Sequence, residues 1–141
     1  MRMVTLLGLQ QMDTAAGRIL VVDDDPSLRE CMAIYLRRLG YEVIACPDGE
    51  EAWALVEAAP LSFALALVDV SLPGMRGDEL ARRILASNAS IAVITASGYP
   101  EDVSRVDGAD GHRVSFLQKP FAPAQLVRAV QAHLPVKADN R

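Results

Sequence analysis

The sequence has no excess of basic residues, few cysteines and no long hydrophobic run. Its 14 lysines and arginines are outnumbered by 18 aspartates and glutamates, which leaves a net charge of −4. A nucleic-acid-binding module needs a basic patch to neutralise phosphates, so this balance argues against direct nucleic-acid binding. The two cysteines, Cys31 and Cys46, lie in apolar segments without CxxC or Cys/His spacing. This favours reduced thiols in the core and a cytoplasmic protein.

No stretch approaches the ~20 apolar residues that a membrane-spanning helix needs, so we expect no membrane segment. The apolar run at residues 3–9 faintly resembles a signal peptide, but it is short and lacks a clear small-residue cleavage site. Either Met1 or Met12 could be the start. We therefore expect three segments, namely a flexible N-terminal tail (1–17), a single domain (18–135) and a C-terminal tail (136–141).

The chain contains a repeated pattern of strands and helices. Its 141 residues, 51% of them hydrophobic, suffice for one domain with a core that needs no disulfide or structural metal. Short apolar runs alternate five times with amphipathic segments, which predicts an α/β fold with a parallel sheet covered by helices on both faces. The predicted strands are 19–22, 41–46, 63–68, 91–94 and 114–118. The predicted helices begin at Pro26, after 47–49, at 78 and at 124, with at most a short one within 99–112.

Apolar spacing also predicts which helix residues are buried. For the first helix they are Leu28, Met32, Tyr35 and Leu39, with Gly40 as its end; for the second they are Ala52, Leu55 and Val56, with Trp53 half-exposed.

Polar residues follow the ends of four predicted strands. Asp23, Asp24 and Asp25 follow the first, Asp69 the third, Thr95 the fourth and Lys119 the fifth. In a doubly wound sheet the ligand site lies outside the carboxyl ends of the strands. Asp23, Asp24 and Asp69 would repel one another there by roughly 4 kcal/mol per pair at 4 Å, so a cation must offset the repulsion. Because these ligands are all hard oxygens, Mg²⁺ is the expected cation.

Together these segments resemble the receiver domain of bacterial response regulators, over Arg18 to about Leu134. The resemblance rests on four motifs in order, each at a strand end: 19–24 (Ile-Leu-Val-Val-Asp-Asp), 67–69 (Leu-Val-Asp) with 72–74 (Leu-Pro-Gly), 94–96 (Ile-Thr-Ala) and 116–121 (Phe-Leu-Gln-Lys-Pro-Phe). It implies a doubly wound five-stranded parallel sheet, the flavodoxin-like (βα)5 receiver fold with strand order 2-1-3-4-5. The irregular stretch from Tyr99 to His112, ending in the motif at 116–121, resembles receivers attached to hybrid histidine kinases more than the stand-alone chemotaxis type.

The resemblance also implies a function in a two-component or phosphorelay pathway. Asp69 would accept a phosphoryl group from a histidine kinase or histidine phosphotransfer protein. Asp23 and Asp24 would bind Mg²⁺ together with Asp69, Thr95 and Lys119 would contact the phosphoryl oxygens, and Thr95 and Phe116 would form a switch. Such transfer needs positioning and charge neutralisation above all, which a metal, an ammonium and a hydroxyl supply. The chain would then be no enzyme beyond its own phosphotransfer and slow autodephosphorylation.

Two other functions stay open. The motif Asp23-x-Asp25 after an apolar strand resembles the nucleophile motif of haloacid-dehalogenase-like Mg²⁺-dependent phosphatases, although Asp107 and Asp110 have no strand before them to supply later metal ligands. A non-phosphorylated docking module is the other alternative. A simpler interpretation, a helix cap, applies to Asp25 and Asp48.

The sequence departs from the usual receiver pattern at two positions near the predicted site and the last helix. Arg76-Gly77 stands where receivers frequently have Asp-Gly, and Ala122 stands where a Ser or Thr cap is common. We predict a cis Lys119–Pro120 bond, which turns the lysine back toward Asp69.

Because only 135–141 follow the last helix, output is expected through a downstream protein or a homodimer, at the face formed by the fourth helix, fifth strand and last helix. Residues 101–111 are expected to form the least stable helix and to respond to phosphorylation.

Overall fold

A computed structural model of the chain describes residues 17–100 and 112–135. Within these two stretches the elements are, in order, β1 (Arg18–Val22), α2 (Pro26–Arg38), β2 (Glu42–Cys46), α3 (Gly49–Ala58), β3 (Leu65–Asp69), α4 (Gly77–Ser87), β4 (Ala92–Ser97), β5 (Val114–Gln118) and α5 (Pro123–His133). The predicted weak helix at 101–111 lies outside the described residues. Among the described residues, no helix is long and apolar enough to cross a membrane.

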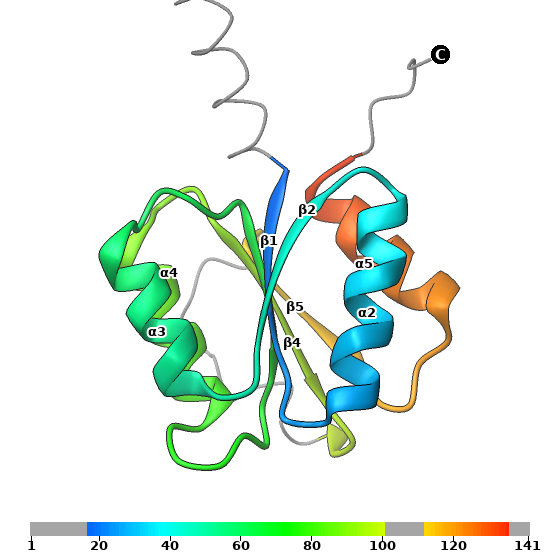
Figure 1. The fold of residues 1–141 in the computed structure, drawn as a ribbon, viewed down its shortest axis with the longest axis horizontal. Coiled ribbons are helices and arrows are strands. Elements are labelled where there is room, and N and C mark those ends of the chain that lie inside the picture. The colour runs from blue at the N-terminus through cyan, green and yellow to red at the C-terminus, as the bar shows by residue number, and fades with distance from the viewer. Residues whose placement is uncertain (1–16, 101–111, 136–141) are drawn as a thin grey trace, which may run out of the picture.

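The five strands form one parallel sheet in the order β2-β1-β3-β4-β5, as expected. Helices α3 and α4 cover one face and α2 and α5 the other (Figure 1). The core accordingly has two parts, one on each face. Because the central strands are buried on both faces, their residues are apolar without alternation, and β3 is buried throughout. This arrangement puts the carboxyl ends of all strands at the lower end of the molecule in Figure 1.

Local signals place the helix ends correctly. Asp25 caps α2 by accepting hydrogen bonds from the backbone N–H groups of Ser27 and Leu28, and Asp48 caps α3 through the N–H of Glu51. Helix α2 ends before Gly40, whose φ of 100° favours glycine. At α5, Ala122 supplies no side-chain cap, as predicted.

Several sequence predictions about burial and strand ends were wrong. Tyr35 is 40% exposed, because the buried stripe of α2 is Met32, Ala33 and Leu36, rotated from the predicted face. Leu55 is also exposed, whereas Trp53 is half-buried as expected. Cys31 is exposed and only Cys46 is a core thiol. The third and fourth strands continue past their predicted ends, to Asp69 and Ser97, because both strands lie inside the sheet and keep pairing there.

Arg113 joins elements that are distant in sequence, and no sequence pattern indicated it. Its guanidinium donates from Nε to the Ile91 carbonyl (2.9 Å) and from Nη2 to the carbonyls of Leu85 (3.0 Å) and Asn88. Two of these carbonyls belong to the end of α4, which leaves its last carbonyls without helical partners. Arg113 thus ties the end of α4 and the start of β4 to the strand beside them.

Candidate functional site

The sheet order brings the strand ends with polar residues together. Strands β1 and β3 are neighbours, with Val22 paired to Val68, so the next residues, Asp23 and Asp69, are adjacent at the same edge. Strand β4 lies on the other side of β3 and pairs Ala96 with Asp69. Topology therefore places residues that are 46 positions apart in one site.

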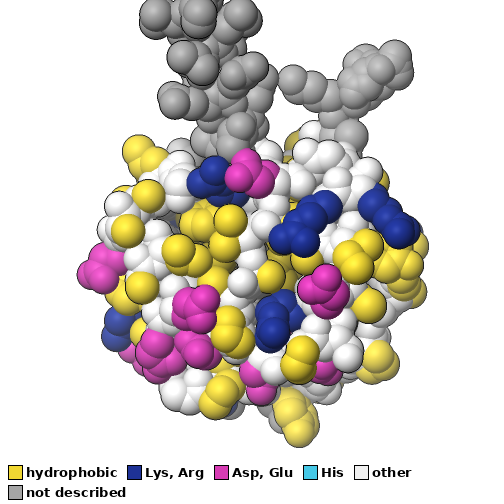
Figure 2. All heavy atoms as spheres, in the orientation of Figure 1, with side chains coloured by type: hydrophobic (Ala, Val, Ile, Leu, Met, Phe, Trp, Pro, Cys, Tyr) yellow, Lys and Arg dark blue, Asp and Glu magenta, His cyan; other side chains and the backbone are white. Residues whose placement is uncertain are grey.

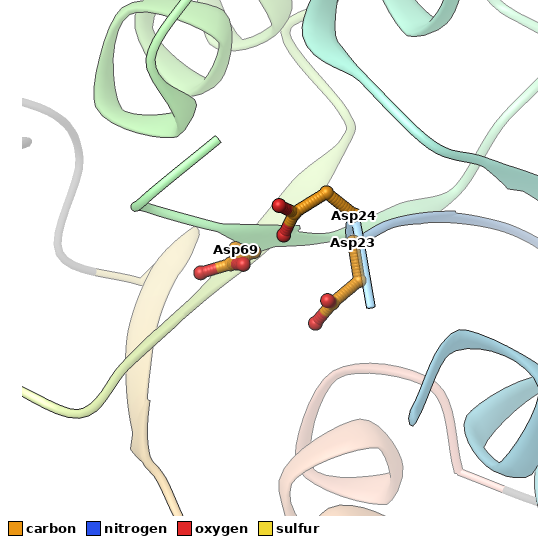
Figure 3. A group of neighbouring side chains, drawn as sticks. All are labelled: Asp23, Asp24 and Asp69. Atoms are coloured by element: carbon orange, nitrogen blue, oxygen red, sulfur yellow. The ribbon is translucent and has the colours of Figure 1, made fainter. Parts of the chain in front are cut away.

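Asp23, Asp24 and Asp69 form an acidic cluster. One carboxylate oxygen from each lies within 4.8 Å of the others, and Figure 3 shows the three side chains converging from β3 and from the segment after β1. Asp23 and Asp69 are buried, at 1% and 5% exposure, whereas Asp24 is exposed. The cluster has two anchored ligands and one that faces solvent, which leaves it open to an ion from outside.

Lys119 reaches this cluster from the segment after β5. Its Nζ lies 3.1 Å from Oδ2 of Asp23 and 3.3 Å from Oδ2 of Asp69. The Lys119–Pro120 bond is cis, as predicted. Burial lowers the pKa of Lys119, but hydrogen bonds and the charges of Asp23 and Asp69 outweigh this effect and raise the pKa above its ordinary value. The lysine is therefore held in its charged form between the two buried carboxylates.

Hydrogen bonds orient the two buried carboxylates. Oδ1 of Asp69 accepts from the N–H of Ser71 at 3.1 Å, and Oδ1 of Asp23 accepts from the N–H of Asp25 at 2.9 Å. Burial raises the pKa of Asp69, against the opposing effects of Lys119 and the Ser71 N–H. Three carboxylates and one ammonium leave two negative charges in a partly buried place, which favours a further cation.

Thr95 and Phe116, the predicted switch pair, lie opposite each other on β4 and β5. The Thr95 side chain is 2% exposed, and its hydroxyl donates to the carbonyl of Ser115 at 3.5 Å. Phe116 is half-buried. The two residues are thus neighbours on the strands that lead from the acidic cluster toward α5.

Two residues that the sequence did not single out hold Asp69 or the loop that follows it. Gly77 is packed so closely against the backbone of Asp69 that an added Cβ would lie 1.9 Å from its carbonyl oxygen. Glu50, in α3, accepts a hydrogen bond from the N–H of Met75 in the loop after β3. The position of Gly77 at the start of a helix could have indicated its close packing. No pattern in the sequence relates Glu50 to Met75.

Comparison with known proteins agrees with this geometry. A family model for the response regulator receiver domain matches residues 19–131. The DNA-binding response regulator MtrA of Mycolicibacterium smegmatis is 37% identical over 129 residues, which cover 92% of this chain and 55% of that protein. The chain spans about half the length of the curated relatives it matches.

Solved structures of receivers share the fold. A CheY-like receiver domain protein from Methanospirillum hungatei superimposes with a TM-score of 0.73 and 32% identity, over 83% of this chain and 92% of that one. The response regulator TrrA of Thermotoga maritima, solved in complex with Mg²⁺-BeF, has a TM-score of 0.72 and 30% identity, over 83% and 98% of the two chains. With the family match, the sheet order and the acidic strand ends, the chain belongs to the response regulator receiver domain family of two-component signalling.

Proposed function

We propose that this chain is a phosphorylated switch, in which Asp69 accepts the phosphoryl group and a partner protein reads the change. The observation that carries the proposal is the position of the Lys119 ammonium, within 3.3 Å of Asp69 and 3.1 Å of Asp23. A structural lysine on the surface would not be placed between two buried carboxylates, because burial of charged groups is costly. A phosphoryl group on Asp69 would give this ammonium an anion to neutralise.

The residues present fit a Mg²⁺ ion. Asp23, Asp24 and Asp69 offer three carboxylate oxygens within 4.8 Å of one another, and Mg²⁺ is bound in proteins by a few carboxylates with water in its other positions. The ion would neutralise negative charge on the phosphoryl oxygens during transfer. The two uncompensated negative charges of the cluster support the same assignment.

The chain's own residues supply the rest of the transfer. A carboxylate oxygen of Asp69 forms a bond to phosphorus, while the bond from phosphorus to the donor, a histidine nitrogen or the acetate oxygen of acetyl phosphate, breaks and the donor leaves with the electron pair. Lys119 balances the charge of the phosphoryl group, and Thr95 donates its hydroxyl once it turns from Ser115. The chain then turns over no substrate besides its own phosphoryl group.

The proposed partners are a histidine kinase or phosphotransfer protein as donor and a downstream protein as target. The relative MtrA is described as a DNA-binding response regulator. For this chain, the acidic balance with a net charge of −4 favours protein over DNA as the direct target. A second copy of the chain is a further candidate target, through β5, α5 and the predicted helix at 101–111, which lies outside the described residues.

Incubation with acetyl phosphate and Mg²⁺ tests the proposal. We expect a covalent, acid-labile phosphoryl adduct, detected by intact-protein mass spectrometry. Continuous release of phosphate from many phosphate esters would instead support a haloacid-dehalogenase-like phosphatase. Absence of any adduct would support a docking module and contradict the proposal.

Removal of a metal ligand should weaken Mg²⁺ binding. Asp23→Ala and Asp24→Ala each take one negative charge and one oxygen ligand from the cluster, so we expect the Kd for Mg²⁺ to rise about tenfold or more in each. Isothermal titration calorimetry measures this value. The matched control is Asp48→Asn, which removes one charge but keeps a capping side chain. Unchanged Mg²⁺ affinity in both alanine variants would refute the ligand assignment.

A further inference from the structure

The loop that follows the proposed phosphoacceptor is fastened at its base. Gly77 donates its N–H to the carbonyl of Val70 at 3.0 Å, which closes the loop from Asp69 to Gly77. Ser71 donates to the Asp69 carboxylate inside it. On the outer side of the loop, Pro73 and Gly74 are exposed. These contacts fix only the base of the loop, so a contact from another element is needed to fix the position of its outer side.

That contact comes from the first turn of α3. Oε2 of Glu50 accepts the N–H of Met75 at 2.9 Å, between residues 25 positions apart. Glutamate is favourable in the first turn of a helix, where the helix dipole stabilises a negative charge. Figure 2 shows acidic side chains gathered at this lower end of the α3 side. A charge-assisted hydrogen bond thus joins a rigid helix to the outer side of the loop.

Two glycines allow this approach. A Cβ on Gly49 would lie 2.9 Å from the Met75 carbonyl oxygen, and one on Gly74 would lie 2.8 Å from Oε2 of Glu50. Gly74 also has a φ of 69°, in the region that favours glycine. The Glu50 carboxylate therefore occupies the space that a side chain at position 74 would fill.

We propose that Glu50 is a positioning residue for phosphorylation, holding the Asp69–Gly77 loop so that Asp69 keeps its geometry. The inference rests on the proposed function of Asp69. Reactions that depend on alignment lose rate steeply when the reacting group is displaced, by as much as about 100-fold for a shift of 1 Å. Glu50 acts through the loop backbone and does not itself touch the phosphoryl group.

Four variants separate the hydrogen bond from the charge. Glu50→Gln keeps an oxygen acceptor of the same length and removes the charge, whereas Glu50→Asp keeps the charge on a side chain too short to reach Met75. Glu50→Ala removes both. The matched control is Glu51→Ala, because Glu51 is in the same helix turn and its carboxylate has no hydrogen bond or ion pair with any described residue.

The test compares the rate of phosphoryl uptake from acetyl phosphate at saturating Mg²⁺, well below each variant's Tm. We expect Glu50→Ala and Glu50→Asp to react about tenfold more slowly, and Glu50→Gln and Glu51→Ala to stay within about twofold of the wild type. A purely structural role would lower Tm without changing the rate of the folded protein.

Two results would overturn the inference while leaving the proposed function intact. One is that all four variants take up the phosphoryl group at the same rate as a wild type that is itself labelled. The other is a slow Glu50→Gln with a normal Glu50→Asp, since this pattern would assign the effect to charge. An unlabelled wild type would overturn the proposed function and the inference together.

Discussion

The Asp69→Asn variant should take up no phosphoryl group from acetyl phosphate under conditions that label the wild type. The amide oxygen of asparagine carries no negative charge and is a poor nucleophile, so the bond to phosphorus does not form. The side chain keeps nearly the same shape and still accepts the Ser71 N–H. Lys119 retains its contact with Asp23. The fold is therefore expected to survive while the chemistry is lost.

Intact-protein mass spectrometry after incubation with acetyl phosphate and Mg²⁺ measures the uptake. Asp48→Asn is the appropriate control, because it makes the same chemical change at an aspartate whose role is to cap α3. That variant should be labelled like the wild type. Full labelling of Asp69→Asn would show that another residue accepts the phosphoryl group.

Gly77→Ala should be among the most destabilising single substitutions in the domain. The added Cβ would lie 1.9 Å from the carbonyl oxygen of Asp69, 2.7 Å from its carbonyl carbon and 2.8 Å from Cα of Val70. All three are backbone atoms of the central strand β3 or the residue after it, so no side chain can rotate away to relieve the clash. We expect a loss of about 3 kcal/mol or more in the free energy of unfolding, at the upper end of overpacking costs.

Urea unfolding measures this loss, with Gly98→Ala as the control. A Cβ on Gly98 meets no heavy atom within 4 Å, and its φ is not in the left-handed region. That variant should be neutral or stabilised by about 0.4–1 kcal/mol, since alanine restricts the unfolded chain. Equal stability of the two variants would contradict the close packing of Gly77 on Asp69. Because the clash falls on the backbone of Asp69 itself, any folded Gly77→Ala should also be labelled slowly.

The correct sequence predictions share a local physical basis. Capping by Asp25 and Asp48 depends on backbone groups two or three residues away. The absence of alternation in the apolar runs follows from burial on both faces of a parallel sheet, which any central strand experiences. Asp23, Asp69 and Lys119 could be expected close together because parallel strands all end at the same edge.

The wrong or missing predictions concern contacts between elements. Which face of α2 is buried depends on how the helix lies on the sheet, so Tyr35 is exposed although its spacing suggested burial. Cys31 is exposed for the same reason. Arg113 and Glu50 bind backbone groups of elements that only the folded chain brings near.

By itself, the sequence determined the order of strands and helices, the helix caps and the polar residues at the strand ends, since each depends on neighbouring residues or on the common direction of parallel strands. Only the tertiary structure decided the distances within the acidic cluster, the placement of Lys119 between Asp23 and Asp69, and the packing of Gly77 and Glu50 around the loop. These features depend on strand register and helix orientation. Both are set by packing energies summed over the whole core, which no local pattern contains.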